Sequence, residues 1–498
     1  MDLITTTLNT LTTTLSVEAF QHSLFVYLII GAFLAFALGF ALGAHDVANT
    51  FGTSVGSKVL TIRQAYTLAT FVETAGAILI GYNVVDTMRK GVVDTSIYVG
   101  EERQFFIAQL GVLFSCALWL LITTFLRLPV SSSHSIVGST VGFSLALKGF
   151  EGINWSMVYR IASSWVISPA LSGIISALLY ILVDLLVLRR ENPVKNGLIC
   201  LPFFYFFCMA FNTFNTVFQG SKILGIEDIS FGWALGIALA VGLAFGLAVQ
   251  FIMRPYLVRY INKVDEAPVP TVQNDASKPV DYDNGKTIGD NKLKITEASA
   301  ISADKKQRFG LAPKTFIHWL LPSRDRKEDD RSLRLFSTIQ VFTACFAGFA
   351  HGANDVANAI SPVAAMLSVY HDRSVLQESP ASIWVFVFGA ASIVIGLWVL
   401  GHRIIVVVGE KMTHIHPAAG FTIEFGAAFT TILASKFGLP VSTTHALIGS
   451  VCTVGSIKSG GGVNWSIFRD IVFAWILTLP ATIGLSAAVT YVLKVLFM

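Results

Sequence analysis

Two copies of one short motif place acid and amide side chains inside otherwise apolar sequence. The first copy, at residues 43–49, reads Gly-Ala-His-Asp-Val-Ala-Asn, and the second, at residues 352–358, reads Gly-Ala-Asn-Asp-Val-Ala-Asn. In each copy the Asp and the final Asn are three positions apart, so they share one face wherever the chain is helical. Carboxylate and amide oxygens are hard ligands for cations such as sodium, and the alternative is a buried acid that only caps a helix. The candidate sodium ligands are Asp46, Asn49, Asp355 and Asn358.

A second repeated segment, Leu-Pro-Val-Ser, occurs at residues 128–131 and 439–442. Pro is favoured in the first turn of a helix, and Ser or Thr caps the free amides there, so each segment predicts a helix N-terminus. Free amides, hydroxyls and the positive end of the helix dipole bind an oxyanion without Lys or Arg. The alternative is ordinary capping of two core helices. The candidate ligands for a tetrahedral anion are Ser131, Ser132, Ser133, Ser442, Thr443 and Thr444.

Four further titratable residues lie in or beside these apolar segments. Glu73 and Glu424 each lie inside an apolar run, where an acid is expensive and therefore a candidate gate, proton site, ion ligand or partner for a basic residue. His134 and His445 directly follow the hydroxyl runs. They could contact the anion or respond to pH near neutrality, and packing behind the site is the alternative.

The elements that must position these residues are apolar runs. The chain has 498 residues, of which 54% are hydrophobic and only 13% are charged, whereas a soluble domain carries about 25% charged residues. Runs of about 20 apolar residues recur, as membrane-spanning helices require, and the alternating pattern of a membrane β-barrel is absent. The sequence therefore predicts an all-α polytopic membrane protein. The small, Gly-rich and polar segment at residues 53–57 predicts a broken helix after the first motif.

The order of these landmarks repeats along the chain. Asp46 matches Asp355 with an offset of 309 residues, and His134 matches His445 with an offset of 311. Several landmarks in one order at nearly one spacing indicate two homologous halves, the usual sign of a transporter built from structural repeats. We therefore expect four parts: a polar N-terminal tail (1–22), a first transmembrane half with connecting spans (23–253), a linker (254–334) and a second transmembrane half (335–498).

The linker is rich in Lys, Arg, Asp, Asn and Ser and has no apolar run, a composition that predicts a largely disordered segment. Basic residues crowd both of its ends, close to the flanking spans, where the positive-inside rule is most informative. They are Arg254, Arg259, Lys263, Arg324, Arg326, Lys327, Arg331 and Arg334. We therefore expect the linker to be cytoplasmic. We also expect the spans to lie in a lipid bilayer, that of the plasma membrane.

At these residues the sequence resembles the inorganic phosphate transporter family, the sodium-phosphate symporters that include the type III transporters of animals. The resemblance extends over about residues 25–252 and 335–495 and excludes the linker. It rests on the segment from Gly352 to Pro362, on residues 53–57, on both Pro-Val-Ser segments and on residues 421–424. It implies two inverted structural repeats with broken helices and re-entrant hairpins, in roughly a dozen helical segments.

The resemblance also implies sodium-coupled symport of H2PO4⁻ by alternating access, with two sodium ions per anion, and it implies homodimers. By position it makes the four acid and amide residues sodium ligands, and residues 131–133 and 442–444 the phosphate site. Glu73 and Glu424 match two glutamates that the family needs for transport. His45 departs from the family, which usually has Asn there, so the sodium affinity or ion choice of this chain could differ.

We therefore expect a secondary active transporter rather than an enzyme, with Na⁺ as the coupling ion and with no cofactor and no nucleic-acid partner. Two sodium ions with one H2PO4⁻ carry a net positive charge, so transport should be electrogenic. The alternatives are a proton-coupled phosphate or sulfate permease of the same fold, and a receptor or phosphate sensor. A remoter alternative is a membrane-embedded metalloenzyme, against which stands the absence of an HExxH sequence. Its ligands would be His45, Asp46, His351 and Asp355.

Overall fold

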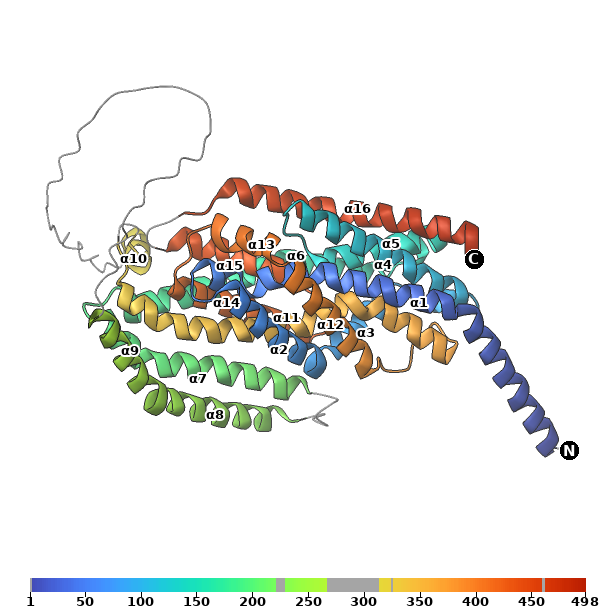
Figure 1. The fold of residues 1–498 in the computed structure, drawn as a ribbon, viewed down its shortest axis with the longest axis horizontal. Helices are drawn as coiled ribbons and strands as arrows, with labels where there is room; N and C mark the ends of the chain where they lie inside the picture. The colour runs from blue at the N-terminus through green and yellow to red at the C-terminus, as the bar shows by residue number, and fades with distance from the viewer. Residues whose placement is uncertain (1, 221–228, 267–312, 324–325, 459–461) are drawn as a thin grey trace, which may run out of the picture.

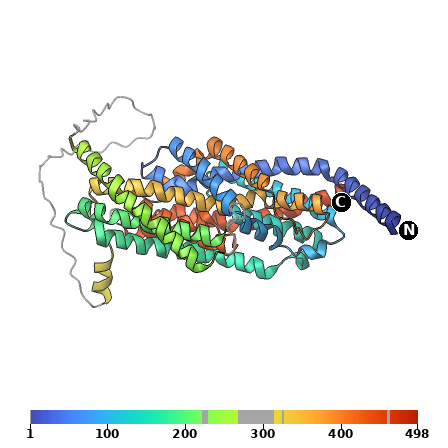
Figure 2. The same cartoon turned by 90° about the horizontal axis from the view of Figure 1, so that it is seen from below.

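The computed structural model describes residues 2–220, 229–266, 313–323, 326–458 and 462–498, and in these ranges the chain forms helices joined by turns and short loops (Figure 1, Figure 2). Most of the helices run along the long axis of one elongated bundle. Within these ranges, nine helices are long and apolar enough to cross a membrane, or up to ten if one bent pair of helices is a single span. The structure confirms the expected all-α polytopic membrane protein.

The helices follow the order of the two predicted halves. The first half holds α1 (Asp2–Gly56), α2 (Ile62–Ile80), α3 (Tyr82–Lys90), α4 (Glu102–Phe125), α5 (Ser132–Lys148) and α6 (Trp155–Val183). The second half holds α11 (Asp330–Asp372), α12 (Ile383–Leu400), α13 (His402–Val406), α14 (Pro417–Lys436), α15 (Thr443–Ile457) and α16 (Trp465–Phe497). Between them come α7 (Pro193–Gln219), α8 (Phe231–Ala248), α9 (Arg254–Glu266) and α10 (Pro313–Leu320).

The two halves interlock, because matching helices pack across onto each other. α5 packs on α16 and α15 packs on α6, while α1 packs on α12 and α11 packs on α2. The first motif glycine of each half makes this close packing possible. A Cβ on Gly43 would collide with the Ile393 carbonyl of α12, and a Cβ on Gly352 would collide with the Glu73 carbonyl of α2. Each motif is thereby fixed against a helix of the opposite half.

The break expected in the first motif region is wrong. α1 continues through residues 43–56 without interruption, and α11 continues through the second motif and past Pro362. Thr50 Oγ1 donates to the Asp46 carbonyl at 3.2 Å within the helix, while Thr53 and Ser54 donate to Glu424 on another helix. The chain turns elsewhere, as between α2 and α3, which are bent by 66° at Gly81, and at the starts of α5 and α15. The motif side chains therefore project from intact helices.

Parts of the expected tail and linker are helical. α1 already begins at Asp2, and α9 and α10 occupy residues 254–266 and 313–320. Arg189, which follows α6, donates from Nη1 to the Trp319 carbonyl at 2.7 Å, so α10 is attached to the first half. The disorder expected for residues 267–312 falls outside the described residues. The second half starts at Asp330, slightly before the expected boundary.

Candidate functional site

The two predicted helix N-termini meet in the interior of the bundle. Ser131 is the N-cap of α5 and accepts from the His134 amide, and Ser442 is the N-cap of α15 and accepts from the His445 amide. The segments also bond to each other in matching pairs. Ser133 Oγ donates to the Val441 carbonyl at 3.0 Å. Thr444 Oγ1 donates to the Val130 carbonyl at 3.4 Å. The two starts therefore form one two-fold arrangement of buried hydroxyls and free helix amides.

The acid and amide motifs join this arrangement from α1 and α11. Asn49 Nδ2 donates to Thr444 Oγ1 at 2.9 Å, and Asn358 Nδ2 lies 3.3 Å from Ser133 Oγ in the matching position. Each half thus contributes an amide to the hydroxyl run of the other half. The sequence-based candidates for the cation and for the anion therefore occupy one continuous buried site rather than two.

One trio of residues links the cation candidates directly to the anion candidates. Ser132 Oγ donates to Asp355 Oδ1 at 3.1 Å. Asn358 Nδ2 donates to the same Asp355 oxygen at 2.9 Å and to Ser132 Oγ at 3.2 Å. Because all three side chains are buried, a ligand that displaces one of these bonds changes the other two.

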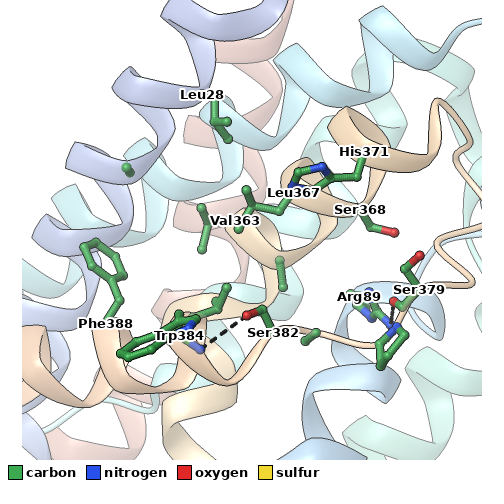
Figure 3. A pocket seen from close by; sticks show the side chains of 15 residues that line it. Leu28, Arg89, Val363, Leu367, Ser368, His371, Ser379, Ser382, Trp384 and Phe388 are labelled. Carbon is green, nitrogen blue, oxygen red and sulfur yellow. Dashed lines mark hydrogen bonds between the residues drawn. The ribbon is translucent and has the colours of Figure 1, made fainter. Parts of the chain in front are cut away.

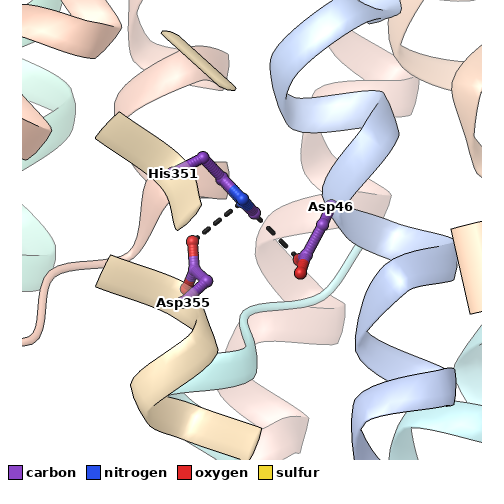
Figure 4. Close-up of side chains that lie close together, drawn as sticks. All are labelled: Asp46, His351 and Asp355. Carbon is purple, nitrogen blue, oxygen red and sulfur yellow. Dashed lines mark ion pairs between the residues drawn. The ribbon is translucent and has the colours of Figure 1, made fainter. Parts of the chain in front are cut away.

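A histidine that the sequence did not single out as a transport residue completes the acidic part of the site (Figure 4). His351 Nε2 lies 2.8 Å from Asp355 Oδ2 and 3.5 Å from Asp46 Oδ1. His351 precedes Asp355 by one helical turn of α11, so the His-x-x-x-Asp spacing was the signal that could have revealed it. The three groups could share a metal ion or hold a proton between two carboxylates.

Several buried oxygens of the site lack hydrogen-bond donors among the described residues. They are Asp46 Oδ2, Glu73 Oε2, Asn354 Oδ1 and Asn358 Oδ1. A buried oxygen acceptor without a donor is destabilising, and a desolvated sodium ion needs such hard oxygen ligands. These four oxygens therefore form a set of ligands that fits sodium as a transported ion.

The two glutamates contact the helices that carry the motifs. Glu73 Oε1 on α2 accepts from Thr50 Oγ1 at 3.1 Å. Glu424 on α14 accepts from side chains of both α1 and α11, which are Thr53 at 2.5 Å, Ser54 at 2.6 Å, Thr343 at 2.9 Å and Gln340 at 3.3 Å. Glu424 therefore ties α1 to α11, so it is placed to respond to any movement of one against the other.

The paired histidines at the helix starts pack against tryptophans. The ring centroids of His134 and Trp165 are 3.7 Å apart, as are those of His445 and Trp475, and the two imidazoles lie 4.5 Å from each other. His445 Nδ1 also lies 3.0 Å from the Trp165 carbonyl. These contacts favour the packing interpretation of both histidines.

His45 faces away from the site. Its Nε2 lies 2.9 Å from Thr124 Oγ1 and 3.2 Å from the Leu120 carbonyl, both on α4. Its counterpart Asn354 donates instead to the Val441 carbonyl at 3.0 Å, next to Ser442. The departure at position 45 therefore alters a helix contact, and His45 does not join the other three proposed ligands of the metalloenzyme alternative.

Comparison with known proteins shows the family to which this chain is similar. The model of the "Phosphate transporter family" matches residues 42–486. "Sodium-dependent phosphate transporter 1-A" of Danio rerio is 32% identical, with 93% of this chain and 94% of the relative covered. "Sodium-dependent phosphate transporter 2" of Homo sapiens is 31% identical, with 88% and 93% covered. The solved structure of "The sodium-dependent phosphate transporter" is similar with a TM-score of 0.73 at 31% identity, over 94% of this chain and 99% of that one.

Proposed function

This chain belongs to the phosphate transporter family, and from that premise we propose that it is a sodium-coupled symporter of inorganic phosphate. Phosphate binds at the facing starts of α5 and α15, where hydroxyls and free amides surround an oxyanion without Lys or Arg. Sodium binds at the acid and amide residues of α1 and α11. The observation that carries this proposal is the Ser132, Asp355 and Asn358 trio, which belongs to both sites at once.

The side chains that the sodium and phosphate sites share supply a physical reason why the binding of the two ions is coupled. An anion buried beside two carboxylates is repelled by them, and a bound cation offsets that repulsion where the surroundings are poorly polarisable. A sodium ion at Asp355 also takes over the carboxylate that Ser132 otherwise contacts at 3.1 Å, which frees the hydroxyl for phosphate. With two sodium ions and one H2PO4⁻, each cycle moves net positive charge inward.

The interlocked halves provide the moving parts. Rocking of one half against the other around the buried site would expose it first to one side of the membrane and then to the other. The chain lies in the plasma membrane with its linker in the cytoplasm. The functional unit is a homodimer, as the resemblance implies.

The test is uptake of radiolabelled phosphate into proteoliposomes, with external sodium or choline, for wild type and Asp355→Asn. Wild type should need sodium, and Asp355→Asn should abolish uptake. The matched control is Asp470→Asn, because Asp470 is exposed and pairs with its neighbour Arg469 away from the site. Uptake that is indifferent to sodium, or equal loss in both variants, would refute the proposal.

Proton coupling is the second candidate, and the position of His351 favours it. The imidazole contacts both carboxylates of the site, so a proton could occupy the place that a cation takes in the first candidate. A pH gradient that drives uptake without sodium would select proton coupling. Competition by sulfate in the same assay tests which oxyanion is carried.

A further inference from the structure

Arg89, near the C-terminus of α3, is a buried cation between two cavities. The residue is only 6% exposed. It lines a larger cavity of about 420 Å³ between α1, α11 and the residues before α12 (Figure 3). It also lines a small cavity of about 10 Å³, together with residues of α4, α5 and α11. The guanidinium therefore lies at the partition between the two cavities.

The guanidinium is held firmly but one of its nitrogens is unused. Nε donates to Asp86 Oδ1 at 2.9 Å, and Nη2 donates to the Ser379 carbonyl at 2.8 Å. Nη1 has no hydrogen-bond partner among the residues that the structure describes. A buried charged donor without a partner is destabilising, and a bound anion would remove that penalty.

The small cavity is lined by the same helices, α5 and α11, that carry the hydroxyl and amide site. Ser361, in its lining, is close to one turn beyond Asn358 on α11, and Thr140 lies on α5, whose first turn carries Ser132. Its volume of about 10 Å³ is roughly that of one water, so the passage is closed to phosphate here. α11 runs from the end of the bundle that holds α9 and α10 toward the opposite end (Figure 1). Arg89 lines the two cavities with α11 residues that follow Asn358, so it lies on the far side of the site from α9 and α10.

The larger cavity has a polar side next to Arg89. Ser368 and Ser379 lie on the side of the guanidinium, whereas Leu28, Val363 and Phe388 form the other side, and His371 also lines the cavity (Figure 3). The Ser368 and Ser379 hydroxyls donate to the Asp372 carboxylate at 2.8 and 2.7 Å, so a small oxyanion here is held by the guanidinium and the His371 imidazole. The side chains of the central site described above include no Lys or Arg, so Arg89 supplies a positive charge that the central site lacks.

We propose that Arg89 forms an outer anion subsite, at which the transported oxyanion binds before it reaches the central site. The planar fork of an arginine matches a phosphate oxygen pair, and Nη1, which is buried without a partner among the described residues, makes that contact once the partition opens. When the partition opens, Thr140 and Ser361 offer the next hydroxyls along the path to Ser132. This inference rests on the proposed function, because it assigns a route to the same substrate.

The rival explanation is that Arg89 only clamps the residues before α12 to α3. Its bond to the Ser379 carbonyl and the bond from Gln377 Nε2 to the Arg89 carbonyl at 3.2 Å would serve such a clamp. The two explanations differ for Asp86→Asn. If Arg89 is only a clamp, loss of the Asp86 carboxylate weakens it. If Arg89 is an anion subsite, it keeps its positive charge in Asp86→Asn, and its guanidinium is freer to bind the anion.

The test measures the KM for external phosphate in cells that express each variant, with surface amounts and melting temperatures compared. Arg89→Gln should raise this KM about tenfold to a hundredfold, as expected for loss of a charge-assisted contact, and Arg89→Lys should raise it less. Asp86→Asn should not raise it. Arg103→Gln, which removes an exposed charge near the start of α4, should leave it unchanged. An unchanged KM in Arg89→Gln, or equal increases in Arg89→Gln and Asp86→Asn, would overturn the subsite.

A second readout does not depend on transport. Ser379→Cys places a thiol in the larger cavity, and phosphate should slow its labelling by an anionic thiol reagent, with the parent chain as the blank. Adding Arg89→Gln should abolish this protection and slow the labelling itself. Protection that persists without Arg89 would refute the subsite. Wild-type protein that takes up no phosphate would instead refute the proposed function. The labelling experiment would still show whether Arg89 binds an anion.

Discussion

Ser132→Ala should uncouple the effect of sodium from the binding of phosphate. The hydroxyl of Ser132 contacts Asp355 at 3.1 Å and Asn358 at 3.2 Å, so it joins a proposed sodium ligand to the proposed phosphate site. A hydrogen bond to a charged group contributes about 1.5–3 kcal/mol. Each 1.4 kcal/mol is about tenfold in affinity, so the factor by which sodium lowers the KM for phosphate should shrink about tenfold or more.

The matching position in the second half supplies the control. Thr443 corresponds to Ser132, but among the described residues no hydrogen bond connects it to Asp46, whose Oδ2 has no partner. Thr443→Ala should therefore raise the KM for phosphate and leave the sodium-dependent factor close to its wild-type value. The contrast between the two variants separates loss of binding from loss of coupling.

The assay is a matrix of initial uptake rates in proteoliposomes over sodium and phosphate concentrations. Coupling between two ligands is reciprocal, so Ser132→Ala must also weaken the effect of phosphate on sodium binding in detergent. Melting temperature and reconstitution yield show whether each variant is folded. If Ser132→Ala kept the full sodium-dependent factor, the shared trio would not be the source of coupling.

Three further predictions follow from individual contacts. Gly352→Ala should abolish transport and lower the melting temperature, because a Cβ there meets the Glu73 carbonyl and overpacking costs about 1–3 kcal/mol. Gly484 has open space around it, so the control variant Gly484→Ala should change neither the melting temperature nor the uptake. His45→Asn should leave the sodium dependence of uptake unchanged, because the imidazole bonds to α4; a shifted sodium affinity would show that position 45 reaches the ion. Burial, with nearby positive charge, lowers the pKa of His416, just before α14, to about 3. Between about pH 6.5 and pH 3 this histidine is therefore protonated in the unfolded chain but neutral in the folded chain, so stability should fall as the pH drops through that range. His416→Asn should flatten that slope in a melting-temperature series, and an unaltered slope would contradict the reasoning.

The helix starts and the motif pairing could be predicted from the sequence because their signals are local. Pro shortly before Ser favours a helix N-terminus, and Ser131 and Ser442 indeed cap α5 and α15. The repeat then identified matching positions in the other half without any knowledge of packing. These signals were enough to name every polar residue of the Ser132, Asp355 and Asn358 trio.

The features that the sequence did not reveal depend on contacts between distant helices. Gly-rich sequence at residues 53–57 predicted a break, yet α1 stays helical because its small residues let it pack closely on other helices, as Gly56 does against Gly409. His351 contacts both carboxylates only because α1 brings Asp46 to within 3.5 Å of it. The direction of His45 toward α4 is likewise set by packing and not by the motif.

The two halves match in backbone but differ in chemistry, and this difference has a consequence for the order of ion binding. Asp355 is engaged by Ser132, Asn358 and His351, whereas Asp46 keeps one oxygen without a partner among the described residues. A cation at Asp46 displaces few bonds, whereas a cation at Asp355 must compete with three neighbours, one of which lines the proposed phosphate site. We therefore expect the first sodium to bind at Asp46 and the second to bind at Asp355 together with phosphate. A symmetric site would give two equivalent ions and no reason for the second to await the anion.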